Sequence, residues 1–223
     1  MSMVRDPQEV SRNQGSSGCA VSLFPLLLLS IMIGSGIIVA VISSWALPGD
    51  RLYPLKRAIE NARLELTFTP RQRLELEIAF DQKRLDEIDL LTEKASSTRV
   101  DYSAVLTDVN NEGEWIIGGK RVIVTPGTEI VGQINQDIYV TVFGILKTDG
   151  TIDAERIQPR EYVFTDKLNS TALNQWLVDG ITITVAHDTV IHGSPVIGSQ
   201  VQVIAFRLPN DQLVARFIEE ISP

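Results

Sequence analysis

The chain has 223 residues, 44% of them hydrophobic, and a formal net charge of −8 at pH 7. This length allows two or three small domains. The acidic balance disfavours nucleic acid as a partner, so we expect none. A single cysteine, Cys19, excludes an internal disulfide.

The longest apolar stretch lies near the N-terminus. No charged side chain occurs between Ala20 and Ala46, and the run from Leu23 to Trp45 is 23 residues long, whereas about 20 residues cross a hydrocarbon core as a helix. We therefore predict a transmembrane helix at residues 20–46 with the lipid bilayer as its partner. The polar residues 1–19 are predicted to form a disordered cytoplasmic tail. Signal-peptide cleavage after Ala46 is the alternative.

Small residues four positions apart within this stretch are spaced to seat a homodimer through the span. They are Ser30 with Gly34, and Gly36 with Ala40.

A simple count of the cations on each side of the apolar stretch does not place residues 1–19 in the cytoplasm. Arg5 and Arg12 precede the stretch, whereas four cations follow it, namely Arg51, Lys56, Arg57 and Arg63. A positive-inside count would place the tail outside. The later cations alternate with Glu60 and Glu65 on a predicted helix, however, and the tail contains nothing that needs translocation.

Residues 48–95 are predicted to form a helical hairpin. The first helix should start near Tyr53 with Pro54 in its first turn. The second should run from Pro70 to about Glu93, because Thr69 to Gln72 has the pattern of a capping box. Apolar residues at helical spacing predict two faces that bury against each other, with further docking onto the span, the β domains or a second copy. These residues are Leu55, Ala58, Ile59, Ala62 and Leu66 in the first helix and Leu74, Ile78, Leu85, Ile88 and Leu91 in the second.

The C-terminal half contains an internal repeat at a constant offset of 61 residues. Upstream, Val105, Thr107 and Asp108 match Val163, Thr165 and Asp166 if the second copy carries three extra loop residues. The duplicated unit is therefore about 60 residues long. The identical pairs at the constant offset include Trp115 with Trp176, Gly119 with Gly180, Thr128 with Thr189, Ile130 with Ile191, Val142 with Val203 and Ile157 with Ile218.

Each copy reads as about five short strands rich in β-branched residues. Gly118-Gly119 and Asp179-Gly180 supply the positive φ angles of two-residue hairpin turns. Because an open sheet of this size would expose its edges, we predict small closed barrels at residues 100–159 and 160–221. The predicted fold class is membrane-anchored α+β: one transmembrane helix, an α-helical hairpin, then two tandem small antiparallel β-barrel domains.

Two resemblances follow from these residues. The motif Leu-Pro-Gly-Asp-Arg-Leu-Tyr-Pro at 47–54, with the helix pair after it, resembles an uncharacterised bacterial helical-hairpin domain of anti-sigma-factor-like membrane proteins. The repeated tryptophan, glycine and Thr-x-Ile-x-Gly pattern looks like an uncharacterised small β-barrel domain of bacterial surface proteins. Both resemblances imply an extracytoplasmic location in the bacterial cytoplasmic membrane, single-pass with the N-terminus inside. They supply no catalytic residue.

We predict no catalytic, cofactor-binding or metal-binding residues. His187 and His192 flank Asp188, but the first copy has Pro126 and Val131 at the corresponding places, so we expect solvent-facing loop residues. The stretch Gly15-Ser16-Ser17-Gly18 lacks the spacing of a nucleophile elbow. The carboxylates of Asp86, Glu87 and Asp89 are expected on the solvated face of a helix.

These observations favour a membrane-anchored extracytoplasmic binding or signalling accessory protein without enzymatic activity. An unknown protein or glycan outside the membrane is the expected ligand. A structural envelope or assembly protein is the alternative function.

Overall fold

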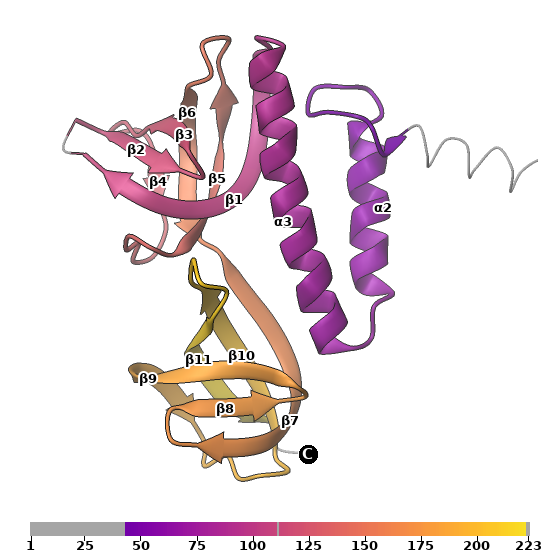
Figure 1. The fold of residues 1–223 in the computed structure, drawn as a ribbon, viewed down its shortest axis with the longest axis vertical. Coiled ribbons are helices and arrows are strands. Elements are labelled where there is room, and N and C mark those ends of the chain that lie inside the picture. Colours follow the sequence, from indigo (N-terminus) through magenta and orange to yellow (C-terminus); the bar gives the residue numbers. More distant parts are fainter. Residues whose placement is uncertain (1–42, 111, 222–223) are drawn as a thin grey trace, which may run out of the picture. The chain divides into compact units, whose positions relative to one another are not determined.

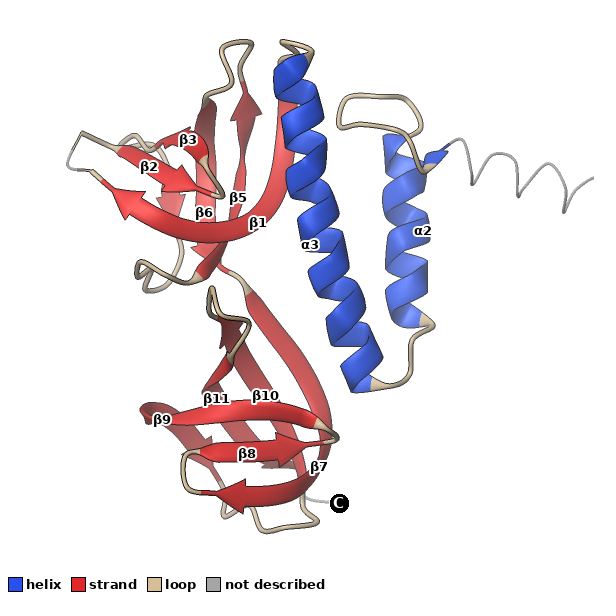
Figure 2. Cartoon of the chain, viewed as in Figure 1, coloured by secondary structure: helices blue, strands red, loops and turns tan. Residues whose placement is uncertain are grey.

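The computed structural model describes residues 43–110 and 112–221, which form an α+β fold (Figures 1 and 2). The predicted tail at 1–19 and all but the last four residues of the predicted span lie outside these ranges. Among the described residues, no helix has the length and apolarity needed to cross a membrane. The helices are α2 (Tyr53–Glu65) and α3 (Pro70–Glu93). The strands are β1 (Thr98–Val109), β2 (Glu114–Ile117), β3 (Lys120–Ile123), β4 (Glu129–Ile130), β5 (Tyr139–Leu146), β6 (Ile152–Pro159), β7 (Glu161–Ala172), β8 (Gln175–Val178), β9 (Ile181–His192), β10 (Gln200–Arg207) and β11 (Leu213–Ile221).

Both helices begin where proline predicts, with Pro54 in the first turn of α2 and Pro70 at the first position of α3. The predicted capping box at Thr69 is wrong, because the Thr69 side chain makes no capping hydrogen bond. Thr69 is exposed, so its hydroxyl is open to water.

The prediction that the two helices bury apolar faces against each other is also wrong. The buried residues of α2 are Lys56 and Glu60, whereas its apolar Leu55 is 38% exposed. Lys56 pairs with Glu87 of α3 at 2.5 Å, and Lys83 of α3 pairs with Glu60 at 3.0 Å. The two helices are therefore joined by ion pairs, because the apolar face of α3 is occupied elsewhere.

That apolar face of α3 packs on both barrels. Leu74 and Ile78 join the hydrophobic core of the second barrel. Leu85, Ile88 and Leu91 join the core of the first barrel, and Ile88 is only 1% exposed. Of the three docking partners that the sequence left open, α3 uses the β domains.

Each copy of the repeat closes into a ring of five strands. In the first copy the order is β3-β2-β1-β5-β6, with β3 pairing to β6 and the short β4 beside β6; in the second it is β10-β11-β9-β8-β7, with β7 pairing to β10. The predicted antiparallel barrel needs a correction, since β3–β6 and β9–β11 are parallel. A ring with an odd number of strands cannot alternate direction throughout. This connectivity is that of OB-type Greek-key barrels.

The predicted offset of 61 residues is confirmed from β2 and β8 onward. Trp115 lies opposite Val122 across β2 and β3, and Trp176 lies opposite Ile183 across β8 and β9. The predicted hairpin turns are confirmed as well, since Gly118-Gly119 and Asp179-Gly180 all have positive φ.

A threonine hydroxyl performs the same task in each copy. The Thr128 hydroxyl donates to the carbonyl of Ala154 at 2.8 Å, and the Thr189 hydroxyl donates to the carbonyl of Ala215 at 2.7 Å. This bond reaches the last strand of each copy, from the segment after β3 in the first and from β9 itself in the second. The threonine of the repeated motif is therefore structural.

The predicted match of Val105 with Val163 is wrong. Tyr102 of β1 lies opposite Val142, and Phe164 of β7 lies opposite Val203, so the first strands correspond at an offset of 62 residues. Strand pairing decides which residues face the core. Tyr102 and Phe164 are buried, whereas Val163 is 48% exposed.

Candidate functional site

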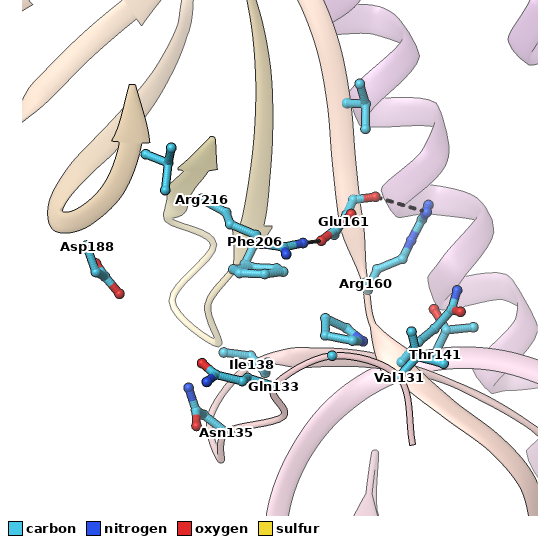
Figure 3. A pocket seen from close by; sticks show the side chains of 15 residues that line it. Val131, Gln133, Asn135, Ile138, Thr141, Arg160, Glu161, Asp188, Phe206 and Arg216 are labelled. Atoms are coloured by element: carbon cyan, nitrogen blue, oxygen red, sulfur yellow. Dashed lines mark hydrogen bonds and ion pairs between the residues drawn. The ribbon is translucent and has the colours of Figure 1, made fainter. Parts of the chain in front are cut away.

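A cleft of about 830 Å³ lies between the two barrels (Figure 3). Its volume lies within the range of about 300–1,000 Å³ that is usual for ligand sites. The first barrel contributes the segment after β4 and parts of β5 and β6; the second contributes β7, β9, β10 and β11. The lining residues include Val131, Gln133, Asn135, Ile138, Thr141, Gln158, Pro159, Arg160, Glu161, Val163, Asp188, Val190, Phe206 and Arg216.

Strand alternation explains why these side chains of the second barrel reach the cleft. In β7, Tyr162 and Phe164 point into the core, so Glu161 and Val163 point outward. In β10, Val203 and Ala205 are buried, and Phe206 lies on the outer face. The cleft is therefore built from the outer face of a closed barrel.

Both arginines of the cleft already have acidic partners. Arg160 Nε donates to Asp81 Oδ2 of α3 at 2.8 Å, and Arg160 Nη2 donates to Glu77 Oε2 at 3.2 Å. Arg216 pairs with Glu161, as Figure 3 shows. These guanidinium groups are thus engaged before any ligand arrives.

Three polar side chains of the cleft are unengaged. Within residues 43–110 and 112–221, the amides of Gln133 and Asn135 and the carboxylate of Asp188 have no hydrogen bond or ion pair, and all three residues are exposed. Figure 3 shows Gln133 and Asn135 on the segment after β4 of the first barrel and Asp188 on β9 of the second. They are the groups of the cleft that can meet a ligand.

Arg160 also holds the junction between the barrels in place. It is the single residue between β6 and β7, and its guanidinium lies 4.7 Å from the centre of the Tyr162 ring. The Tyr162 hydroxyl donates to Asp81 at 3.1 Å. Burial alone would lower the pKa of Arg160, but the charges of Asp81 and Glu77 outweigh it and the pKa is raised. The junction is therefore clamped to α3, which supports a preformed cleft.

A second polar cluster explains the motif at 47–54 and the lysine that follows it. The backbone amide of Leu47 donates to Asp50 Oδ2 at 2.8 Å. Lys56 is 3% exposed, and its Nζ donates to the carbonyl of Ala46 at 2.7 Å while pairing with Glu87. Lys56 thus links the chain that enters the hairpin to α3, while the Asp50 bond closes a local turn. The motif therefore has a structural role.

Glu87 corrects an expectation, since it is buried whereas Asp86 and Asp89 are exposed. Burial raises the pKa of Glu87 above its ordinary value of 4.5, and Lys56 opposes this shift without cancelling it. The folded state therefore binds the Glu87 proton more tightly than the unfolded state does. The resulting contribution to stability is present below pH 4.5 and is lost as the pH rises through the folded-state pKa.

We therefore expect the wild-type protein to lose stability relative to Glu87→Gln as the pH rises from about 4 to about 7. Urea unfolding at several pH values measures this difference. A Glu75→Gln variant, which alters an exposed ion pair of α3, tests whether loss of any carboxylate on the helix has the same effect. The expectation is contradicted if the difference in free energy of unfolding between the wild type and Glu87→Gln does not change with pH, or if the wild type gains stability relative to the variant as the pH rises.

Neither histidine lines the cleft, although His187 directly precedes Asp188 in the chain. His187 and His192 are exposed, as expected, but they lie in strand β9 instead of a loop. The His192 ring meets Phe217 edge-on at 5.0 Å. In the described part of the chain, no three His, Cys, Asp or Glu side chains are grouped to hold a metal ion. The stretch Gly15 to Gly18 lies outside it.

Sequence reasoning missed the cleft, although the repeat contains a signal for it. At the offset of 61, Gln133 and Asn135 of the first copy correspond to Ser194 and Val196 of the second. Two amides thus stand in one copy where the other has a hydroxyl and an aliphatic side chain. The two copies do not share these residues, so the barrel itself does not require an amide at either position.

Comparison with known proteins finds no matching curated protein sequence. One matching solved structure is described as drosophila Unr CSD456; it is 14% identical, covers 60% of this chain and 67% of that chain, and gives a TM-score of 0.22. A TM-score of this size does not establish a shared fold.

Two domains of unknown function do match the chain. DUF5667 matches residues 45–114, and DUF5666 matches residues 104–158 and again residues 166–219. The DUF5667 match covers the helical hairpin and its adjoining strand, and the two DUF5666 matches cover one barrel each.

Proposed function

We propose that this protein is a membrane-anchored, extracytoplasmic binding or signalling accessory protein without enzymatic activity. The observation that carries the binding role is the cleft between the barrels. It has the volume of a ligand site, its arginines are already paired, and its unengaged groups are two amides and one carboxylate. Such a set binds by hydrogen bonding and shape.

The absence of enzymatic activity is proposed from the side chains of the cleft. A nucleophile needs a base within hydrogen-bonding distance. Of the described residues, neither His187 nor His192 makes a side-chain hydrogen bond, and neither lines the cleft.

The anchor is proposed from the apolar run at 23–45, with the N-terminus in the cytoplasm and the barrels outside. The fastening of residues 46–50 to α2 and α3 suits such an anchor, because the folded part would begin directly at the end of the span. The hairpin would then connect the span to both barrels, since α3 packs on each of them. The resemblance of the hairpin to domains of anti-sigma-factor-like proteins supports a signalling context.

We expect a reporter that is active only outside the cytoplasm to be active, and to remain with the membrane fraction, when it is fused after Pro223. The apolar run would hold the chain in the bilayer and the C-terminus would lie outside. A matched fusion after residue 19 should be silent. Silence of the C-terminal fusion contradicts the orientation, and release of an active fusion into the medium contradicts the anchor.

A further inference from the structure

We infer that the cleft between the barrels binds an uncharged glycan. This inference rests on the proposed binding role and names the chemical class of its ligand. The unengaged cleft groups, the paired arginines and the apolar side chains beside them carry it.

The charges of the cleft favour a neutral ligand. Arg160 and Arg216 oppose Glu161 and Asp188, so the lining side chains carry no formal net charge. An anionic ligand would have to break the pairs of Arg160 with Asp81 or of Arg216 with Glu161, because no unpaired cation lines the cleft as described. The unpaired Asp188 and the net charge of −8 would also repel it.

The free polar groups match hydroxyls. Each amide, on Gln133 and on Asn135, offers both a donor and an acceptor, and the carboxylate of Asp188 offers acceptors. A sugar hydroxyl also donates and accepts, so one hydroxyl can satisfy either half of an amide. An array of this kind suits a ligand whose edge carries many hydroxyls.

Apolar surface lies beside these groups. The ring of Phe206 is half-buried in β10, and Ile138 and Pro159 of the first barrel line the same cleft. Figure 3 labels Phe206 and Ile138. A sugar ring has a C–H face and a hydroxylated edge, so it can use both kinds of surface at once. Aromatic side chains bury such a face with little loss of their own conformational freedom.

Sheet topology disfavours an extended peptide. Peptides that bind to sheets gain affinity by adding a strand to a free edge. Both rings are closed, and among the described strands only the two-residue β4 has a single neighbour. A peptide ligand is therefore treated as a competing outcome of the test.

The test uses the full-length protein in phospholipid nanodiscs, which avoid sugar-based detergents. Calorimetric titration compares four probes: a neutral β-1,4-linked N-acetylglucosamine hexamer, a neutral α-1,4-linked glucose hexamer, a galacturonate hexamer and an uncharged peptide of ten residues. We expect at least one neutral hexamer to bind with a Kd below about 1 mM. Neither the galacturonate nor the peptide should bind as tightly.

The Gln133→Ala/Asn135→Ala variant should weaken that binding by about tenfold or more, since two amides are lost. Both residues are exposed, so the fold should persist, as circular dichroism would check. The matched control is Asn61→Ala/Gln72→Ala, which removes the same two residue types from exposed positions of the hairpin. It should bind like the wild type.

The inference is overturned if neither neutral hexamer binds, or if the cleft variant binds them as well as the control does. Cleft-dependent binding of the galacturonate or the peptide in their place would overturn the ligand class but leave the proposed binding role standing. If no probe binds in a cleft-dependent way, the binding role fails with it. The anchor and its orientation are judged separately by the reporter fusions.

Discussion

Replacing Asp81 with alanine should lower the free energy of unfolding by about 3–5 kcal/mol, the usual cost of removing one partner from a buried ion pair. Asp81 is 4% exposed and serves three groups. Its Oδ2 accepts from Arg160 at 2.8 Å and from the Tyr162 hydroxyl at 3.1 Å, and its Oδ1 lies 3.6 Å from Arg84. The substitution would leave these groups without their shared acceptor in a poorly solvated place.

Asp86→Ala is the control for this substitution, because Asp86 lies on the same helix but is exposed and accepts only from Gln82, at 2.9 Å. It should change stability by less than about 0.5 kcal/mol. Asp81→Asn keeps one acceptor oxygen and should fall between the two. Urea unfolding followed by circular dichroism gives all three values. A loss below about 1 kcal/mol for Asp81→Ala would show that the clamp does not hold the junction.

Truncation of either repeated tryptophan to alanine should cost about 3 kcal/mol, at the lower end of the range for core tryptophans because both rings are only partly buried. Trp115 packs against the core of the first barrel and Trp176 against that of the second. Because the two residues hold equivalent registers, their costs should agree within about 1 kcal/mol.

Trp45 provides the matched control, since it is the third tryptophan of the chain and is 82% exposed. Trp45→Ala should change the stability of the barrels by less than about 0.5 kcal/mol. Chemical unfolding of the full chain in nanodiscs, followed by circular dichroism, measures the three variants under one condition. If Trp115→Ala and Trp176→Ala both cost less than about 1 kcal/mol, the rings are surface residues and a ligand platform becomes the better interpretation.

The ends of helices and strands could be predicted because the signals for them are local. Pro54 lies in the first turn of α2 and Pro70 begins α3, since proline fits the first turn of a helix and is excluded from its interior. The dipeptides Gly118-Gly119 and Asp179-Gly180 form two-residue turns because they tolerate positive φ. The duplication was visible because both copies keep the same residues at one spacing.

The candidate site could not be predicted in the same way. Gln133 and Asp188 are 55 positions apart, and no periodicity in either segment says that they line one cleft. Only the clamp of Arg160 on α3 and the closing of both rings bring the two segments together. The mismatch of Asn135 with Val196 could have drawn attention to one side of the cleft, but it contains no information about the other.

The sequence by itself determined where the helices, strands and turns lie and that the β unit occurs twice, because backbone sterics and residue alternation act within a few residues. Tertiary structure alone decided which partner each face would take. The apolar stripe of α3 covers the barrels, so the ion pairs of Lys56 and Glu87 join the helices instead. An amphipathic pattern predicts that one face of a helix is buried. The hydrophobic effect depends on the apolar area buried and not on which segment covers it, so the choice of partner depends on packing among segments distant in the chain.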